Sequence, residues 1–176
     1  CPDLFGPGKH KEFFFLFDYC QNLEFFSQNP ETTDGALGES LGKRLFKTRL
    51  ELISELDRKL SGVAQEGPER EAALRRETAF VLREEVAAMN VDNFVVRPKR
   101  RLVEKYAKAD AWAELKTDAF AQLAHEVAGL PSEQEVEDEE AKRFDLLILN
   151  LQLAVLRAEP TFERLRDQVK EIAGLL

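Results

Sequence analysis

Hydrophobic side chains recur every three or four residues along most of the chain after residue 36, which is the spacing of one face of an α-helix. The first such stretch, residues 37–60, carries charged residues between its leucines and is predicted to form one long amphipathic helix that ends at Gly62. A second helix is predicted from Pro68 to about Asn90, because proline is tolerated in the first turn of a helix.

Shorter helical segments are predicted in the middle of the chain. One follows Pro98, and a second is a short turn that Asp110 would cap and that holds Trp112. A third would be capped by Thr117 and would end at Gly129, because glycine is the residue most often found just beyond a helix C-terminus.

Two further helices are predicted in the last third of the chain. The acidic stretch 131–140 would lead into a helix N-terminus, where the helix dipole favours negative charge. The following segment, 141–157, has apolar residues on nearly all sides and is predicted to be the central, buried helix of the fold. Pro160 would then open a final helix.

The N-terminal part has a different pattern. Residues 1–11 are rich in proline and glycine and are predicted to form a loop, and residues 12–19 form a continuous aromatic run typical of a strand buried on both faces. The only other run of β character is Phe94–Val96, so the remaining strands of such a sheet are expected upstream. Because residue 1 is Cys1 and the only methionine is Met89, we expect this chain to be part of a longer protein.

These patterns predict a mainly α fold. The sequence favours a multi-helix, bundle-like domain over residues 36–176, preceded by one orphan β-strand within residues 1–28. With 44% hydrophobic and 33% charged residues, the 176-residue chain has the composition of a globular protein rather than a disordered one.

Charge and cysteine content narrow the function classes. The net charge of -8 argues against attraction of the whole surface to nucleic acid, so any contact with a polyanion must be local. No apolar run approaches the length of about 20 residues that a membrane helix needs. Two cysteines without a leader peptide favour a reducing, cytoplasmic location.

Sequence motifs for catalysis are nearly absent. The chain has no phosphate-binding GxxxxGK[ST] loop, no GxGxxG and no HExxH motif. Its histidines and cysteines are too scattered to predict a metal site (His10, His125, Cys1, Cys20). Two carboxylates lie in apolar segments, Asp18 and Asp145; Asp18 either faces a ligand crevice at a strand end or caps the following turn.

One local feature differs from this acidic background. Five cations, which we call the basic cluster, lie within nine residues beside Asn93 and Phe94: Arg97, Lys99, Arg100, Arg101 and Lys105. Such a group at a junction between a loop and a helix is suited to binding phosphate through charge-assisted hydrogen bonds. The alternatives are a solvated helix start or pairing with the acidic residues 133–140.

Four segments resemble a known family. They are CPDLFGPGKHKEFFFLFDYCQNLEFF at the N-terminus, ESLGKRLFKTRLELI, NVDNFVVRPKRRLVEKY and EEAKRFDLLILNLQLAVLR. Together they resemble the C-terminal part of the motor (R) subunit of type I restriction endonucleases and of related DEAD/DEAH-type helicases. The resemblance implies that residues 1–28 are the remnant of the second RecA-like lobe.

The resemblance also implies which activities lie in which parts of the longer protein. R subunits of this family use ATP and magnesium to translocate duplex DNA, and they cut it with a separate nuclease domain. The phosphate loop, the ATP-contacting arginines and the nuclease residues would all precede Cys1, so we expect no catalytic residue and no cofactor within this chain. The helical region would contact the methyltransferase and specificity subunits and flank the DNA path.

Two hypotheses follow. The first is a non-catalytic interaction module that couples a restriction motor to the modification assembly. The alternative is a helicase-associated nucleic-acid-binding module that grips phosphates through residues 97–105. The salt dependence of binding distinguishes the two hypotheses. Binding to the phosphate backbone of nucleic acid weakens steeply as the salt concentration rises, whereas docking through an apolar helix face does not. A free-standing enzyme is disfavoured because no assembled site is visible in the sequence.

Overall fold

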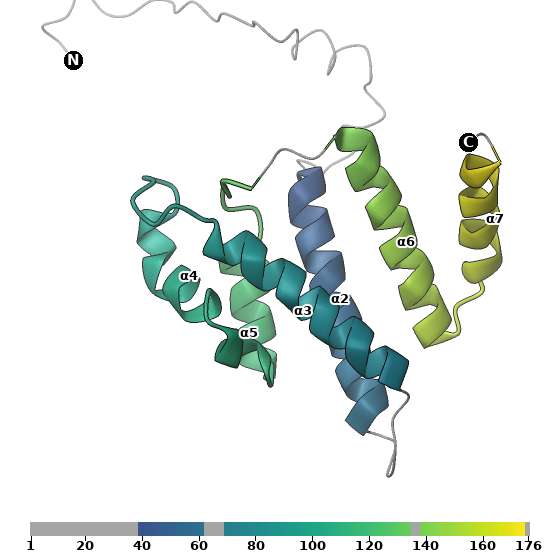
Figure 1. Ribbon diagram of the computed structural model, residues 1–176, viewed down its shortest axis with the longest axis horizontal. Helices are drawn as coiled ribbons and strands as arrows, with labels where there is room; N and C mark the ends of the chain where they lie inside the picture. Colours follow the sequence, from purple (N-terminus) through teal and green to yellow (C-terminus); the bar gives the residue numbers. More distant parts are fainter. Residues whose placement is uncertain (1–38, 62–68, 135–137, 175–176) are drawn as a thin grey trace, which may run out of the picture. The chain divides into compact units, whose positions relative to one another are not determined.

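The computed structural model describes residues 39–61, 69–134 and 138–174, and most of these residues are helical (Figure 1). The long helices are α2 (Leu41–Ser61), α3 (Glu69–Ala87), α6 (Glu139–Arg157) and α7 (Phe162–Ala173). The short elements between α3 and α6 are η2 (Arg97–Lys99), α4 (Arg100–Tyr106), η3 (Ala109–Trp112), α5 (Thr117–Gln122) and the π-helical turn η4 (Leu123–Val127). The predicted mainly α class is therefore confirmed.

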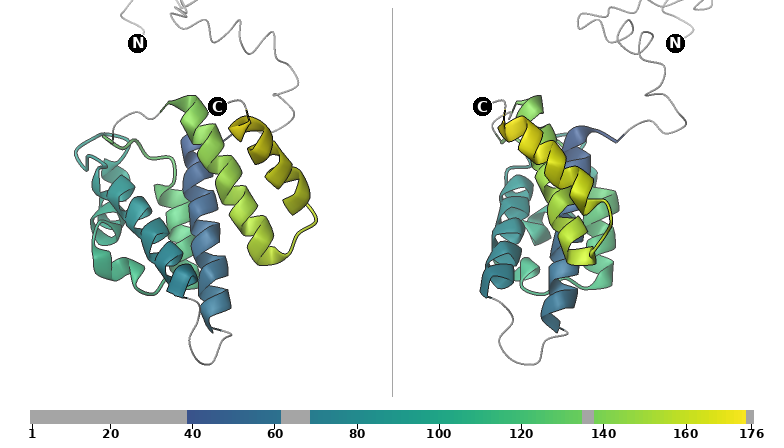
Figure 2. Two further views of the ribbon diagram at one scale, coloured as in Figure 1. Left: turned by 45° about the vertical axis from the view of Figure 1, so that its right-hand side comes forward. Right: turned by 90° about the vertical axis from the view of Figure 1, so that its right-hand side faces the viewer.

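Helix α2 is the central element of the described fold because it buries two faces. Phe46, Leu50 and Ile53 pack into a core shared with α3 and the short helices. Leu52 and Leu56 lie on the other face and pack against α6. Figure 2 shows α2 running between α3 and α6, with α7 on the far side of α6.

The larger of the two cores joins α2 and α3 to the short helices. Val103 and Tyr106 of α4 are buried there together with Trp112 of η3. The Trp112 indole Nε1 donates a hydrogen bond to the Tyr106 carbonyl oxygen at 2.7 Å, and the two rings meet edge to face. These contacts hold α4 and η3 against α3.

A half-buried arginine connects the same elements. Arg75 of α3 donates two hydrogen bonds to the Asp57 carboxylate of α2, at 2.9 and 3.3 Å, and a third to the Trp112 carbonyl oxygen at 2.6 Å. A two-pronged guanidinium–carboxylate pair fixes orientation as well as distance. Arg75 therefore sets how α2, α3 and η3 are placed relative to one another.

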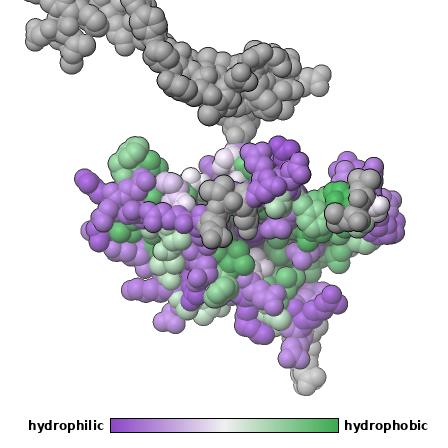
Figure 3. Space-filling model, turned by 45° about the horizontal axis from the view of Figure 1, so that its top comes forward, coloured by the Kyte–Doolittle hydropathy of each residue, from purple (hydrophilic) through white to green (hydrophobic). Residues whose placement is uncertain are grey.

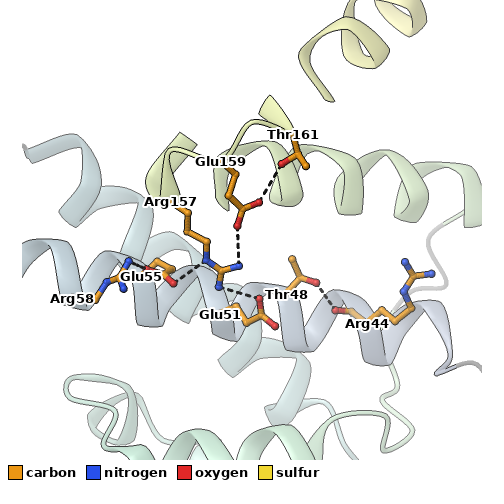
Figure 4. A network of polar contacts seen from close by, with 8 residues as sticks. All are labelled: Arg44, Thr48, Glu51, Glu55, Arg58, Arg157, Glu159 and Thr161. Carbon is orange, nitrogen blue, oxygen red and sulfur yellow. Dashed lines mark hydrogen bonds and ion pairs between the residues drawn. The ribbon is translucent and has the colours of Figure 1, made fainter. Parts of the chain in front are cut away.

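Helix α6 is attached to α2 at its C-terminal end by a polar network (Figure 4). Arg157 donates hydrogen bonds to Glu55 at 2.9 Å and to Glu51 at 3.3 Å, both on α2, and lies 3.8 Å from Glu159. The hydrogen bond to Glu55 raises the pKa of Arg157 above its ordinary value. The pairs are partly exposed, so they orient α6 more than they stabilise the fold.

Three of the sequence predictions are wrong in detail. Segment 141–157 is not the central helix, because its buried residues lie on the side that faces α2 while Phe144 and Val155 are exposed. Asp110 and Thr117 do not cap their helices: Asp110 lies inside η3, Thr117 is the first residue of α5, and neither N-terminus has a side-chain cap. Gly129 does follow the last turn of this segment, with a φ of 89°.

The predicted strand over residues 12–19 lies outside the described residues, and no strand is found within them. The run Phe94–Val96 forms turns rather than a strand. Ser40–Leu176 forms one compact unit, while the predicted domain ranges 1–28 and 36–176 stay predictions. Within the described part of the chain, no helix is both long and apolar enough to cross a membrane.

Candidate functional site

The loop before the basic cluster is shaped by two asparagines. Asn90 Oδ1 accepts a hydrogen bond from the Asp92 N–H at 3.0 Å, and Asn93 Oδ1 accepts one from the Val95 N–H at 2.9 Å. Such side-chain contacts stabilise tight turns. Val96 is fully buried and anchors the loop in the core, so the residues around it are directed outward.

Three of the five cations in the basic cluster have partners within the fold. Lys99 Nζ lies 2.6 Å from Glu126 Oε2, and Arg100 Nε donates to Glu104 Oε1 at 2.7 Å. Lys105 Nζ donates to the Tyr106 hydroxyl at 3.1 Å and lies 3.3 Å from the amide oxygen of Gln122. The charge of Lys99 and of Arg100 is therefore largely balanced locally.

Arg100 is the most strongly paired of the exposed cations. The hydrogen bond with Glu104 raises the pKa of the Arg100 guanidinium above its ordinary value, and Asp92 lies 3.9 Å away. Arg100 is therefore a poor candidate for phosphate binding, because a phosphate would compete with two carboxylates.

Arg97 and Arg101 differ from the other three. Both are exposed, and neither guanidinium has a hydrogen bond or an ion pair with any residue that the structure describes. Arg101 borders an open hollow of about 380 Å³ that Lys105 and Lys108 also line, together with the carboxylates of Glu104 and Asp110. Of the five predicted residues, these two arginines are the ones whose side chains have no partner among the described residues.

The acidic stretch does not neutralise the basic cluster in the described residues. Glu133 accepts a hydrogen bond from the Asn90 side chain at 2.9 Å, and its N–H donates to the Ala88 carbonyl. Glu139 pairs with Arg143 on its own helix. The expected pairing with residues 133–140 is therefore not found for the described members of that stretch, and residues 135–137 lie outside the described residues.

Hydrophobic side chains accompany the basic cluster at the surface. Phe94 is 84% exposed, and Val95 beside it is also exposed. Figure 3 shows a hydrophobic patch over the loop between α3 and α4, surrounded by hydrophilic side chains. Scattered exposed hydrophobic residues are normal on protein surfaces, so this pair by itself does not mark a binding site.

A second surface lies on the side of α6 that faces away from α2, beside α7, which also packs against α6. We call it the outer α6 face; its residues alternate at spacings of four and three: Phe144, Ile148, Leu151 and Val155. Phe144 is 41% exposed and Val155 is 56% exposed, while Ile148 and Leu151 are half-buried between them. This spacing is that of a helix seam which packs against another helix.

The outer α6 face continues into a groove between α3 and α6. Leu74 and Val81 of α3 and Ile148 of α6 line the groove, which has a volume of about 190 Å³. Arg49 of α2 forms part of its lining and lies 3.1 Å from Asp145 and 3.8 Å from Glu85. Asp145, a carboxylate singled out in the sequence, is thus part of an ion-pair network rather than of an acid–base pair.

The other candidates for chemistry give no assembled site. Across residues 39–61, 69–134 and 138–174, no group of three or more His, Cys, Asp or Glu side chains is placed to hold a metal ion. His125 is exposed on η4, and the remaining candidates lie outside the described residues: Cys1, His10, Asp18 and Cys20.

Comparison with known proteins identifies no relative of this chain. No family model, no curated protein and no solved structure matches the chain. The resemblance to the R subunits of restriction enzymes therefore stays a prediction that rests on the sequence segments alone.

Proposed function

We propose that this chain is a non-catalytic helical coupling module of a type I restriction R subunit, and that it contacts the methyltransferase and specificity subunits. The observation that carries this proposal is the outer α6 face, where Phe144 and Val155 are exposed on a helix whose opposite side packs against α2. Contiguous exposed apolar side chains on a folded domain commonly mark a protein interaction site.

Contact with water is unfavourable for the apolar side chains of the outer α6 face. Burial of apolar surface is favourable by roughly 25 cal/mol per Å², so a partner that covers phenylalanine and valine side chains gains binding energy there. The adjoining groove adds Leu74 and Val81 from α3, so two helices of the module would share the contact. Arg49 and Asp145 at its edge supply polar groups that would fix the register of a docked helix.

The docking proposal predicts a sharp effect of charge on the outer α6 face. The double substitution Phe144→Glu with Val155→Glu is expected to weaken binding to purified methyltransferase and specificity subunits of the same restriction system by about 30-fold or more, as for residues central to an interface. Calorimetric titration of the full chain measures this loss. Both positions are exposed, so the helical content by circular dichroism should stay unchanged.

The matched control is the pair Phe94→Glu with Val95→Glu, which makes the same two chemical changes at exposed sites of the α3–α4 loop. This variant should bind the subunits as the unmodified chain does. Equal weakening by both pairs, or no weakening by the α6 pair, would contradict docking through α6.

Nucleic-acid binding is the second candidate function, and it is favoured by the two arginines whose side chains have no partner among the described residues. Arg97 and Arg101 would each contact a phosphate of duplex DNA, while Lys99 and Arg100 stay paired with their carboxylates. With a chain charge of -8, binding of duplex DNA by the isolated chain is expected to be weaker than about micromolar at physiological salt.

This candidate predicts that Arg97→Glu with Arg101→Glu abolishes measurable duplex binding in fluorescence anisotropy. Replacement of the same arginines by glutamine should lower the slope of log affinity against log salt by about two units, because about one counterion is released for each phosphate contact. The charge-matched control is Arg70→Glu with Arg164→Glu, exposed sites on α3 and α7. If the control weakens binding equally, only the net charge matters and the cluster has no specific role.

A further inference from the structure

A hollow of about 220 Å³ lies between α3 and the η3 turn, on the side of α3 that faces away from the α6 groove. Arginines of α3 and the exposed ring of Phe80 form one wall, and the small residues Ala109 and Ala113 form the other. Trp112 also lines the hollow. Small side chains opposite an aromatic ring leave room for a flat group.

Phe80 is 56% exposed, although it lies in the middle of a long helix. The guanidinium of Arg83 lies over its ring, with the central carbon 5.0 Å from the ring centroid. Arg83 also pairs with the neighbouring Glu84, and its buried Nε has no hydrogen-bond partner among the described residues. The ring and the guanidinium together form a stacking platform.

Positive charge is available at the same hollow. Arg75 already donates hydrogen bonds to the Asp57 carboxylate and to the Trp112 carbonyl oxygen. Arg76, by contrast, is exposed, and its guanidinium has no hydrogen bond or ion pair within the described ranges. An aromatic platform beside a free arginine is suited to a ligand that carries both a flat ring and an anionic group.

The hollow also lies close to the basic cluster. The η3 turn and the residue after it separate the two: Ala109 and Ala113 border the Phe80 hollow, while Asp110 and Ala111 border the hollow of Arg101. A chain of phosphates that joins Arg101 to Arg76 would therefore have to cross η3.

We propose that the Phe80 hollow binds an unstacked base of single-stranded nucleic acid, with the base on the Phe80 ring and its phosphate on Arg76. The strand would continue over η3 to Arg101 and Lys108. Aromatic side chains that stack bases within a positively charged path are the usual design of single-strand binding, and they tolerate any sequence. The proposal deepens the second candidate function, nucleic-acid binding, and depends on it for the path beyond η3.

The test uses the full chain and a fluorescently labelled oligothymidylate of about twelve nucleotides, which lacks secondary structure. Phe80→Ala is expected to weaken binding about tenfold, since loss of one stacked base has an effect of this order. Arg76→Glu is expected to weaken binding as well and to reduce its salt dependence. The matched control is Phe144→Ala, an exposed phenylalanine on α6, which should have no effect.

A second readout comes from Trp112, the only tryptophan of the chain, which lines the hollow. Oligothymidylate is expected to change its fluorescence in the unmodified chain and not in the Phe80→Ala variant. An abasic oligonucleotide of equal length should leave Trp112 fluorescence unchanged, because it supplies phosphates without a ring.

Three results would overturn the proposal. They are an unchanged affinity of the Phe80→Ala variant for oligothymidylate, equal binding of the abasic strand, and displacement of labelled oligothymidylate by an acidic peptide as readily as by the unlabelled oligonucleotide. The outcome is separable from that of duplex binding. If Arg97 and Arg101 prove irrelevant to duplex DNA while thymidylate binding depends on Phe80, the duplex function fails and the base site stands. If duplex binding depends on the two arginines and Phe80→Ala is neutral, the base site alone fails.

Discussion

Replacing Phe46 with alanine is expected to lower the free energy of unfolding by about 3–5 kcal/mol, the usual cost of removing a buried phenylalanine. Phe46 is fully buried on α2, in the core that joins α2 to α3 and the short helices. The cavity would lie where several elements meet, so little collapse around it is possible. Urea denaturation followed by circular dichroism measures the change.

Phe94→Ala is the matched control for this experiment. The ring of Phe94 is almost fully exposed, so its loss should change the free energy of unfolding by less than about 0.5 kcal/mol. If the Phe46 and Phe94 variants were equally stable, α2 would not be the central helix.

Leu153→Ala is expected to cost about 2–5 kcal/mol, whereas Val155→Ala on the same helix should change stability by less than about 0.5 kcal/mol. Leu153 is 4% exposed and packs against α2, while Val155 points away from it on the outer α6 face. The two residues are separated by only one position, so helix propensity and local charge are nearly the same for both.

Thermal and urea denaturation of the two variants test this difference. Equal destabilisation would mean that both sides of α6 are buried, as the apolar pattern of 141–157 suggests. A neutral Leu153→Ala would mean that α6 does not depend on its contact with α2.

The helices are predictable from the sequence because each carries a periodic apolar pattern. The leucines of residues 37–60 alone indicate α2, and Pro68 with the residues after it indicates the start of α3. The central position of α2 is not predictable in the same way. Periodicity shows that a helix has an apolar face, but it does not show whether the covering surface belongs to the same chain. Helix α6 therefore looked central because two of its sides are apolar and only one is covered by α2.

The caps at Asp110 and Thr117 failed for a different reason. Asp and Thr favour the N-cap position. Which of several neighbouring residues becomes the N-cap depends, however, on where the buried residues place the first turn of the helix. Burial of Trp112 and Leu115 sets the η3 turn two residues earlier than a cap at Asp110 would, with Lys108 before its first residue.

The candidate site was only half predictable. The five cations of the basic cluster are evident in the sequence, but their pairing is not, because Glu126 and Gln122 lie on another element and reach Lys99 and Lys105 only in the fold. The Phe80 hollow was missed entirely. Phe80 belongs to a helical segment whose neighbouring arginines look like an ordinary solvated face, and only the η3 turn opposite makes them a hollow.

The coupling proposal and the nucleic-acid proposal use different surfaces of the same module. The outer α6 face is apolar and lies on one side of α2, while the basic cluster lies with α3 and the short helices on the other. Docking of a protein partner on α6 therefore leaves Arg97 and Arg101 accessible. A module arranged in this way would hold a protein assembly and a DNA segment at the same time.

The most direct test of the coupling function is the salt dependence of binding between the full chain and the methyltransferase and specificity subunits, measured by calorimetry. Because docking through the outer α6 face buries apolar surface, the dissociation constant should change less than about threefold between about 50 and 300 mM salt, and the heat capacity change should be negative. A steep loss of affinity with salt and no heat capacity change, or no binding at either salt concentration, would contradict the account.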